Sequence, residues 1–224
     1  MRLNSIHGRL GKAFSVTLIV LFAGLGDAQS SAGRVKLPPV KGLTEPAEPE
    51  HPLPAAQDVH DAKYKLSWHV PAGWNFDRQD GALSDFHKDV RSAPQRSEVR
   101  GVASINFNPY PASTFSGATL YYSVLPVTSA AGCAAEAATK PVKPMGDAVF
   151  AGKTFKHGQD QHGAICTESR DEVYTVLQGR SCLRFDMVIN TFCHASSGAM
   201  EISPTQLKDL NQRMAKMLDS IRLD

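Results

Sequence analysis

Three residues in one polar stretch could act as metal ligands. His157, His162 and Cys166 follow one another in an H-x4-H-x3-C pattern, with Asp160 between the two histidines. Imidazole nitrogens and a thiolate are ligands that zinc prefers, but a structural zinc site needs four of them. No second cluster at a recognised spacing completes the set, and the stretch is interpreted as a polar hairpin loop. We therefore expect neither a metal site nor a cofactor.

Cys193 and His194 are neighbours in the sequence, which would suit a thiol nucleophile and its base if the two side chains could meet. Neighbouring residues of a strand point to opposite faces of a sheet, so these two do not form such a pair. The chain also contains no G-x-S-x-G, H-E-x-x-H, Walker or G-x-G-x-x-G motif. We expect no catalytic residue, and a protein that is not an enzyme.

The acidic residues offer no pair for general acid–base catalysis. They are scattered along the chain, and the sequence places no two of them across a cleft. Each is interpreted as a solvated surface charge or a turn residue: Asp77, Asp80, Asp85, Asp89, Asp171, Glu172 and Asp186.

The clearest structural element is a β-hairpin between residues 173 and 190. In its second strand, apolar residues at odd positions 183–189 alternate with mostly polar residues at even positions 182–188, which predicts a half-buried strand. Gly179-Arg180 suits a two-residue turn because glycine occupies the position that needs a positive φ. This turn pairs Gln178 with Ser181.

The hairpin register selects one pairing of the four cysteines. Four cysteines in a secreted protein form two disulfides, with three possible connectivities. Cys166 faces Cys193 across the hairpin, whereas Cys182 lies eleven residues from Cys193 along the same strand, or roughly 30 Å. A disulfide spans at most about 7 Å between Cα atoms, and the same offset separates Cys166 from Cys182. The predicted disulfides are therefore Cys166–Cys193 and Cys133–Cys182.

A well-marked helix ends the chain. Ser203 is placed to cap it, Pro204 suits its first position and Gln206 completes an S-x-x-Q capping box. Ile202 and Leu207 are spaced for a hydrophobic staple, and apolar residues recur at three- and four-residue steps up to position 221. We expect this helix to pack across the sheet that contains the hairpin.

The remaining segments predict an α+β fold with mainly antiparallel neighbours. Strands are predicted over residues 64–70, 101–107, 118–125 and 149–155, a short helix from 128 or 129 to 138, and a polar surface loop over 85–98. Trp68 and Trp74 are assigned to the core rather than to a carbohydrate-stacking surface, because Trp68 shares a strand face with apolar residues.

The first 61 residues indicate targeting rather than a folded domain. Residues 1–28 combine basic residues, an apolar run and small residues before a cleavage site, as secretory signal peptides do. The apolar run is shorter than the roughly 20 residues of a membrane span, and an uncleaved anchor is the alternative. Residues 29–61 are rich in proline, which predicts a disordered linker. Residues 62–224 then form a single domain.

The charge balance argues against nucleic acid and membrane partners. The chain has 24 Lys and Arg residues and 22 Asp and Glu residues, of which residues 1–28 contain three and one. The rest of the chain is formally neutral and has no basic field that would capture phosphates or anionic lipid. We expect no nucleic acid partner and no membrane span after signal cleavage.

Four segments together resemble the PsbP-like superfamily. They are the strand and P-x-G-W turn of residues 64–74, AGKTFKH, CLRFDMVIN and SPTQLKDLNQRMAKMLDSIRL. This superfamily includes the lumenal extrinsic subunit of photosystem II, a Ran-binding nuclear import factor and small bacterial envelope proteins. The resemblance covers residues 62–224 and implies an α/β/α sandwich, in which helices flank an antiparallel sheet of about six strands. It assigns no site residue, because the binding residues of those proteins match no motif here.

The sequence favours a secreted or periplasmic accessory domain that binds an unknown protein or small ligand without chemistry. One alternative is an envelope hydrolase whose site is assembled from separated strands, which convergent His and carboxylate side chains in a deep pocket would favour. The other is a structural cell-surface module, which an exposed apolar patch and the absence of a pocket would favour.

Overall fold

The hairpin predicted from the sequence forms the centre of a seven-stranded antiparallel sheet. In the computed structural model, which describes residues 52–81 and 83–224, β8 (Thr167–Gln178) pairs with β9 (Ser181–Phe192), and Gln178 lies opposite Ser181. The register is therefore the predicted one. Gly179 has a φ of 59°, a conformation that residues with a Cβ rarely adopt, so glycine suits this turn.

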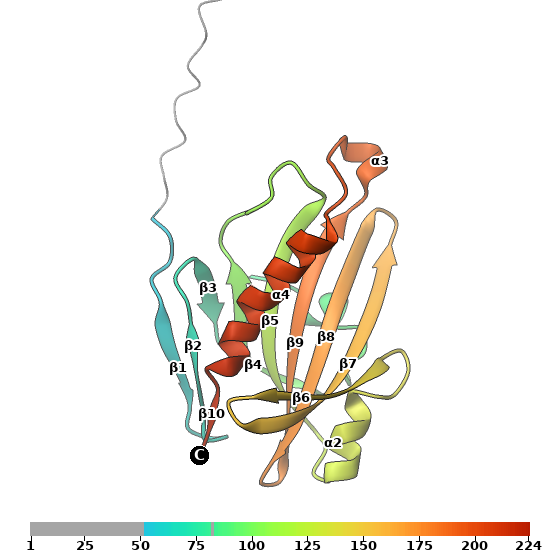
Figure 1. Ribbon diagram of the computed structural model, residues 1–224. Helices are drawn as coiled ribbons and strands as arrows, with labels where there is room; N and C mark the ends of the chain where they lie inside the picture. The colour runs from blue at the N-terminus through green and yellow to red at the C-terminus, as the bar shows by residue number, and fades with distance from the viewer. Residues whose placement is uncertain (1–51, 82) are drawn as a thin grey trace, which may run out of the picture. The chain divides into compact units, whose positions relative to one another are not determined.

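The described residues form two sheets, as Figure 1 shows. The large sheet has the order β3-β4-β5-β9-β8-β7-β6 and the small one β1-β2-β10, and all paired neighbours are antiparallel. The other strands are β1 (Gln57–Asp61), β2 (Leu66–Val70), β3 (Trp74–Asp77), β4 (Glu98–Ile105), β5 (Phe115–Leu125), β6 (Lys143–Phe150), β7 (Lys153–Ala164) and β10 (Arg222–Leu223). The helices are α1 (Phe86–Asp89), α2 (Ala130–Glu136), α3 (His194–Ser197) and α4 (Pro204–Asp219). The α+β class is confirmed, and the large sheet has seven strands rather than about six.

Helix α4 crosses one face of the large sheet. The predicted capping box is present, because the Gln206 N–H donates to Ser203 Oγ at 3.3 Å and the Ser203 N–H donates to Gln206 Oε1 at 2.8 Å. The apolar stripe of the helix packs against β2, β5 and β9. Trp68 and Trp74 are 2% and 4% exposed, so both tryptophans belong to the core, as predicted.

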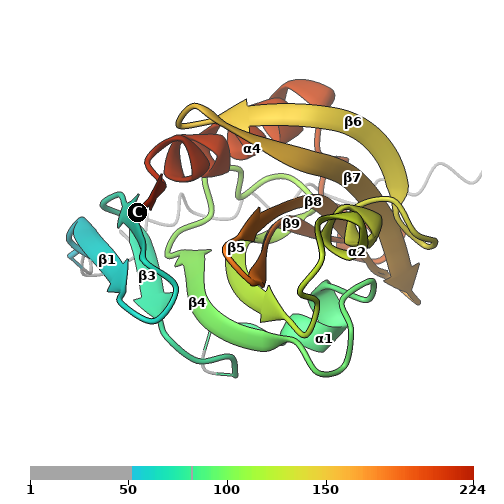
Figure 2. The same cartoon turned by 90° about the horizontal axis from the view of Figure 1, so that it is seen from below.

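Helices α1 and α2 lie on the opposite side of the central strands from α4 (Figure 2). Phe86 and Val90, in and just after α1, are fully buried against β4, β5 and β9. Helix α2 ends so close to β7 that a Cβ on Gly158 would lie 2.2 Å from the Ala137 carbonyl oxygen. Strand β9 is consequently buried on both faces, which corrects the prediction of a half-buried strand.

The two disulfides have the pairing that the register argument selected. Cys133 and Cys182 join α2 to the start of β9, with a Cα–Cα distance of 5.4 Å. Cys166 and Cys193 join the turn between β7 and β8 to the end of β9, with a Cα–Cα distance of 4.5 Å. Both therefore staple segments to the same strand.

Three local predictions need correction. Residues 85–98 are not a plain surface loop, because they contain α1 and bury Phe86. Residues 149–155 are not one strand but the turn of the long β6–β7 hairpin. Gln57–Asp61, within the range predicted as linker, forms β1 and pairs with β2.

The predicted signal peptide, residues 1–28, and the predicted linker up to residue 51 lie outside the described residues. In the part of the chain that the structure describes, no helix combines the length and apolar character needed to cross a bilayer.

Candidate functional site

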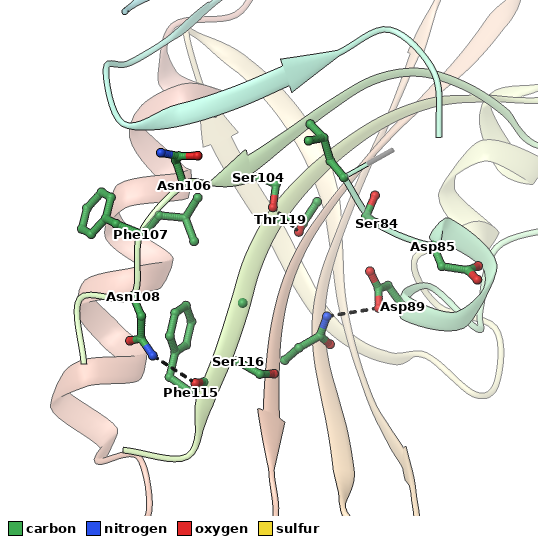
Figure 3. Close-up of a pocket in the computed structure, with 14 residues that line it drawn as sticks. Ser84, Asp85, Asp89, Ser104, Asn106, Phe107, Asn108, Phe115, Ser116 and Thr119 are labelled. Carbon is green, nitrogen blue, oxygen red and sulfur yellow. Dashed lines mark hydrogen bonds between the residues drawn. The ribbon is translucent and has the colours of Figure 1, made fainter. Parts of the chain in front are cut away.

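A cavity of about 450 Å³ lies on the α1 side of the large sheet, and we call it the polar cleft. Figure 3 shows its lining, which comes from the segment leading into α1, from the ends of β4 and β5, and from the loop after β4. The polar side chains that line it are Ser84, Asp85, Asp89, Ser104, Asn106, Asn108, Ser116, Thr119 and Asn190. Phe107 and Phe115 supply its aromatic surface. Among the described residues no lysine or arginine lines the polar cleft, although Asp85, which does, is paired with Lys88 at 2.7 Å.

Asp89 owes its position to the docking of α1. Both carboxylate oxygens of Asp80 accept the Phe86 N–H, at 3.1 and 3.0 Å, and so fix the start of this short helix. The Phe86 ring packs edge-to-face on Tyr121, with centroids 5.1 Å apart. Because α1 is anchored by this buried ring, its last residue, Asp89, points over the sheet toward Asn190.

The Asp89 carboxylate is held by two donors from the sheet. Tyr121 donates its hydroxyl to Asp89 Oδ2, and Asn190 Nδ2 donates to Asp89 Oδ1 at 3.1 Å. Asn190 is fixed in turn, because its Oδ1 accepts from Ser169 Oγ at 2.7 Å. Burial raises the pKa of Asp89, although the hydrogen bonds from Tyr121 and Asn190 oppose this shift. The site thus presents a preorganised acceptor in a half-buried position.

The loop after β4 forms the opposite wall of the polar cleft. Asn106 Oδ1 accepts from Asn75 Nδ2 at 2.6 Å, and Asn108 Oδ1 accepts the Tyr110 N–H at 2.7 Å. Both amides are therefore oriented by the protein before any ligand arrives. Between them Phe107 is 37% exposed and offers an aromatic face next to fixed amide groups.

A second depression, of about 530 Å³, adjoins the polar cleft and shares Asp89, Ser116 and Asn190 with it. We call it the basic pocket because Lys88, Arg91 and His162 line it. Arg91 reaches to 3.5 Å from the buried Asp160 carboxylate. The groups on this side are therefore partly neutralised by acidic residues of the chain itself.

Beneath α1 and α2 lies a buried ionic cluster, formed by Arg184, Asp171 and Asp186. All three residues are 0% exposed. Arg184 Nε donates to both carboxylate oxygens of Asp186, at 2.8 and 3.1 Å, while its Nη2 is 3.7 Å from Asp171 Oδ2. Burial raises the pKa of Asp171 well above its ordinary value, and the negative charge of Asp186 adds to this shift. The prediction that Asp171 and Asp186 are solvated surface charges is therefore wrong.

The three potential metal ligands of the sequence are not brought together. His157 contacts Glu172, whereas His162 Nδ1 is 3.2 Å from Asp160 Oδ2. Cys166 is in a disulfide with Cys193. The two histidines lie on strand β7, not in the predicted hairpin loop. Across residues 52–81 and 83–224, no group of three or more His, Cys, Asp or Glu side chains is arranged to hold a metal ion.

Sequence reasoning missed Asp89 and Asn190 as site residues. The two lie 101 positions apart, so no local pattern connects them. One signal in the sequence could have revealed the buried ionic cluster. The face of β9 that carries Arg184 and Asp186 also carries Cys182 and Val188, and apolar residues among charged ones indicate that a strand face is covered. In the structure both Cys182 and Val188 are 0% exposed.

No protein-family model and no curated protein sequence matches the chain. It is similar to the solution structure of PsbP from Synechocystis sp. PCC 6803, at 10% identity and a TM-score of 0.41, over 76% of this chain and 93% of that one. It is also similar to LpqN of Mycobacterium tuberculosis, which is involved in cell envelope biogenesis. The identity is 9% and the TM-score 0.33, over 75% of this chain and 90% of that one. The Ran-binding protein Mog1p of Saccharomyces cerevisiae matches at 10% identity and a TM-score of 0.37, over 75% of this chain and 95% of that one.

PsbP and a Ran-binding protein are also the kinds of protein that the four sequence segments resemble. Identities of this size concern the fold alone, so we take no ligand, partner or activity from these structures.

Proposed function

We propose that this chain is a secreted or periplasmic accessory domain that binds a small, neutral, hydroxyl-rich ligand in the polar cleft and carries out no chemistry on it. The observation that carries the proposal is the fixed Asp89–Asn190 pair at the edge of a cavity of about 450 Å³. Ligand sites combine a concave surface with a small number of oriented polar groups, and the polar cleft has both. Two disulfides in the described chain support an oxidising compartment.

The chemistry of the lining favours a carbohydrate or a related polyol. Carboxylate and amide groups accept from and donate to ring hydroxyls, and here Asp89, Asn106 and Asn190 offer both kinds of partner. The exposed face of Phe107 suits the apolar face of a sugar ring. An anionic ligand is disfavoured because the Asp89 carboxylate lines the cavity and no lysine or arginine of the described residues does, while Asp85 is already paired with Lys88 at 2.7 Å.

The proposal is tested by NMR titration of the protein purified from a secreting host, with maltose as the probe. We expect saturable shifts at the amides of residues 104–108, 116–119 and 190. Phe107→Ala should weaken binding about tenfold, and Ser104→Leu, which fills the polar cleft, should abolish it. Arg180→Ala, in the turn at the far end of β9, is the matched control and should bind like the wild type.

Two results would count against the proposal. Saturable binding of aspartate, with none of maltose at concentrations up to about 100 mM, would contradict the neutral ligand class. Release of glucose in the same sample would show that the domain is an enzyme, in agreement with the hydrolase alternative.

A further inference from the structure

A third cavity, of about 490 Å³, lies on the opposite face of the large sheet from the polar cleft. Helix α4 packs against β2, β5 and β9, and Figure 1 shows β7 and β8 beside the helix rather than under it. The cavity lies along this edge, between His157, Glu172 and Tyr174 of the sheet and Leu207 and Asn211 of α4. We call it the amphipathic groove.

The sheet side of the amphipathic groove carries an oriented histidine. His157 Nε2 lies 2.6 Å from Glu172 Oε2, and its ring stacks on Tyr174 with centroids 4.5 Å apart and planes inclined by 9°. Because a carboxylate only accepts hydrogen bonds, the Nε2 N–H of His157 donates to Glu172 in this contact.

Glu172 is half-buried, and its hydrogen-bond partners among the described residues are His157 and Gln159. Its other oxygen accepts from Gln159 Nε2 at 2.9 Å, and its side chain is 19% exposed. Within the described residues no lysine or arginine forms an ion pair with it. A carboxylate that is partly removed from water without a cation is destabilised, and a bound cation would offset that cost.

The rest of the lining is mainly apolar and comes from β9 and α4, with Met187, Leu207 and Ala215. Asn211 also lines the amphipathic groove, but its Oδ1 is closed off from solvent and makes no hydrogen bond to any residue that the structure describes. We therefore assign this oxygen no contact with a ligand.

We propose that the amphipathic groove binds a small primary amine in its ammonium form, attached to an apolar body. An ammonium group donates hydrogen bonds and accepts none, and the Glu172 carboxylate, which forms no ion pair with a lysine or arginine of the described residues, is its acceptor in the groove. The apolar body lies on Met187 and Leu207. Lys208 also lines the amphipathic groove, but it is exposed, and long charged side chains of this kind extend their ammonium end into water.

The test is an NMR titration of the secreted protein with three six-carbon probes: hexylammonium, hexanol and hexanoate. The three share the apolar body and differ only in the polar end. We expect saturable shifts at residues 157, 172–174 and 207–215, with hexylammonium bound most tightly and hexanoate least. Glu172→Gln should weaken hexylammonium about tenfold and leave hexanol almost unchanged.

Thr205→Ala is the matched control, because Thr205 is an exposed residue of the same helix that does not line the amphipathic groove. Hexanoate or hexanol binding more tightly than hexylammonium would overturn the proposal. So would an unchanged hexylammonium affinity in Glu172→Gln, a variant that preserves the shape of the side chain and removes only its charge.

Discussion

At the scale of single residues, the buried ionic cluster contains two aspartates with opposite consequences. Arg184 holds Asp186 with hydrogen bonds to both carboxylate oxygens, whereas Asp171 lies 3.7 Å from the guanidinium and has no hydrogen bond to a described residue. One positive charge is thus shared by two fully buried carboxyl groups. Burial raises the pKa of both carboxyl groups, but only Asp186 accepts hydrogen bonds from Arg184 in return.

Asp171→Asn is expected to stabilise the protein at alkaline pH. The pKa of Asp171 is raised above its ordinary value of 3.8 by burial, so the folded state binds this proton more tightly than the unfolded chain. The stability that this tighter proton binding contributes is fully present below about pH 3.8. It is lost as pH rises through the pKa of Asp171 in the folded state. At pH 8 the variant should gain about 1–3 kcal/mol in free energy of unfolding. Urea denaturation at several pH values checks this, and the gain should shrink toward pH 4.

Asp186→Asn, by contrast, is expected to destabilise the protein. The change removes the carboxylate that accepts from Arg184 Nε at 2.8 and 3.1 Å, and it leaves a buried guanidinium with poor compensation. The free energy of unfolding should fall by about 3–5 kcal/mol at neutral pH, measured in the same urea experiment. Equal effects of the Asp171 and Asp186 changes would contradict this assignment of roles.

At the scale of elements, the two disulfides differ in what they hold. Cys133–Cys182 fastens α2 over the buried end of β9, closes a separation of 49 residues and packs in a core cluster with Leu125. Cys166–Cys193 closes 27 residues between segments already joined by a backbone hydrogen bond of 3.2 Å. Replacing Cys133 and Cys182 by serine should cost about 4 kcal/mol by loop entropy, and replacing Cys166 and Cys193 should cost less. Urea denaturation of both double variants tests the order, and the opposite order would refute the argument.

The strength of the local signal in each element explains which elements the sequence predicts. The β8–β9 hairpin and α4 carry local signals, a glycine turn and a capping box, that are close in sequence to the residues they organise. Helix α1 has four residues and no side-chain cap, so nothing periodic marks it, and only the burial of Phe86 shows its importance. Strand β6 is almost entirely exposed or half-buried and lacks the alternation of a half-buried strand. The polar cleft depends on the weakly marked α1, which positions Asp89, and this is why the sequence does not reveal the cleft.

At the scale of the whole molecule, the intact mass of the secreted protein tests the processing predicted from the sequence. We expect the mass of residues 29–224 less four hydrogens, because both disulfides are formed and the signal peptide is removed. A mass that includes residues 1–28 would indicate an uncleaved anchor. Free thiols in the mass would contradict the disulfide pairing.

The large sheet separates two surfaces of different chemistry. Figure 2 shows α4 on one side of the central strands and α1 and α2 on the other. The polar cleft lies on the α1 side, whereas the amphipathic groove lies beside α4, and β9 contributes Asn190 to the first and Met187 to the second. If both proposals hold, the sites share one strand but no lining residue.

Binding at the two sites should therefore be independent. A rigid, hydrogen-bonded strand transmits little between its faces unless it has two arrangements that the ligands can select between. Strand β9 is paired along its whole length with β8 and over most of it with β5, which leaves it one arrangement. Hexylammonium affinity should change less than about twofold in saturating maltose, and the converse titration should agree because coupling is reciprocal. A tenfold change would instead show that β9 couples the sites, and Met187→Leu, a volume-conserving change on the shared strand, would then be expected to alter the coupling.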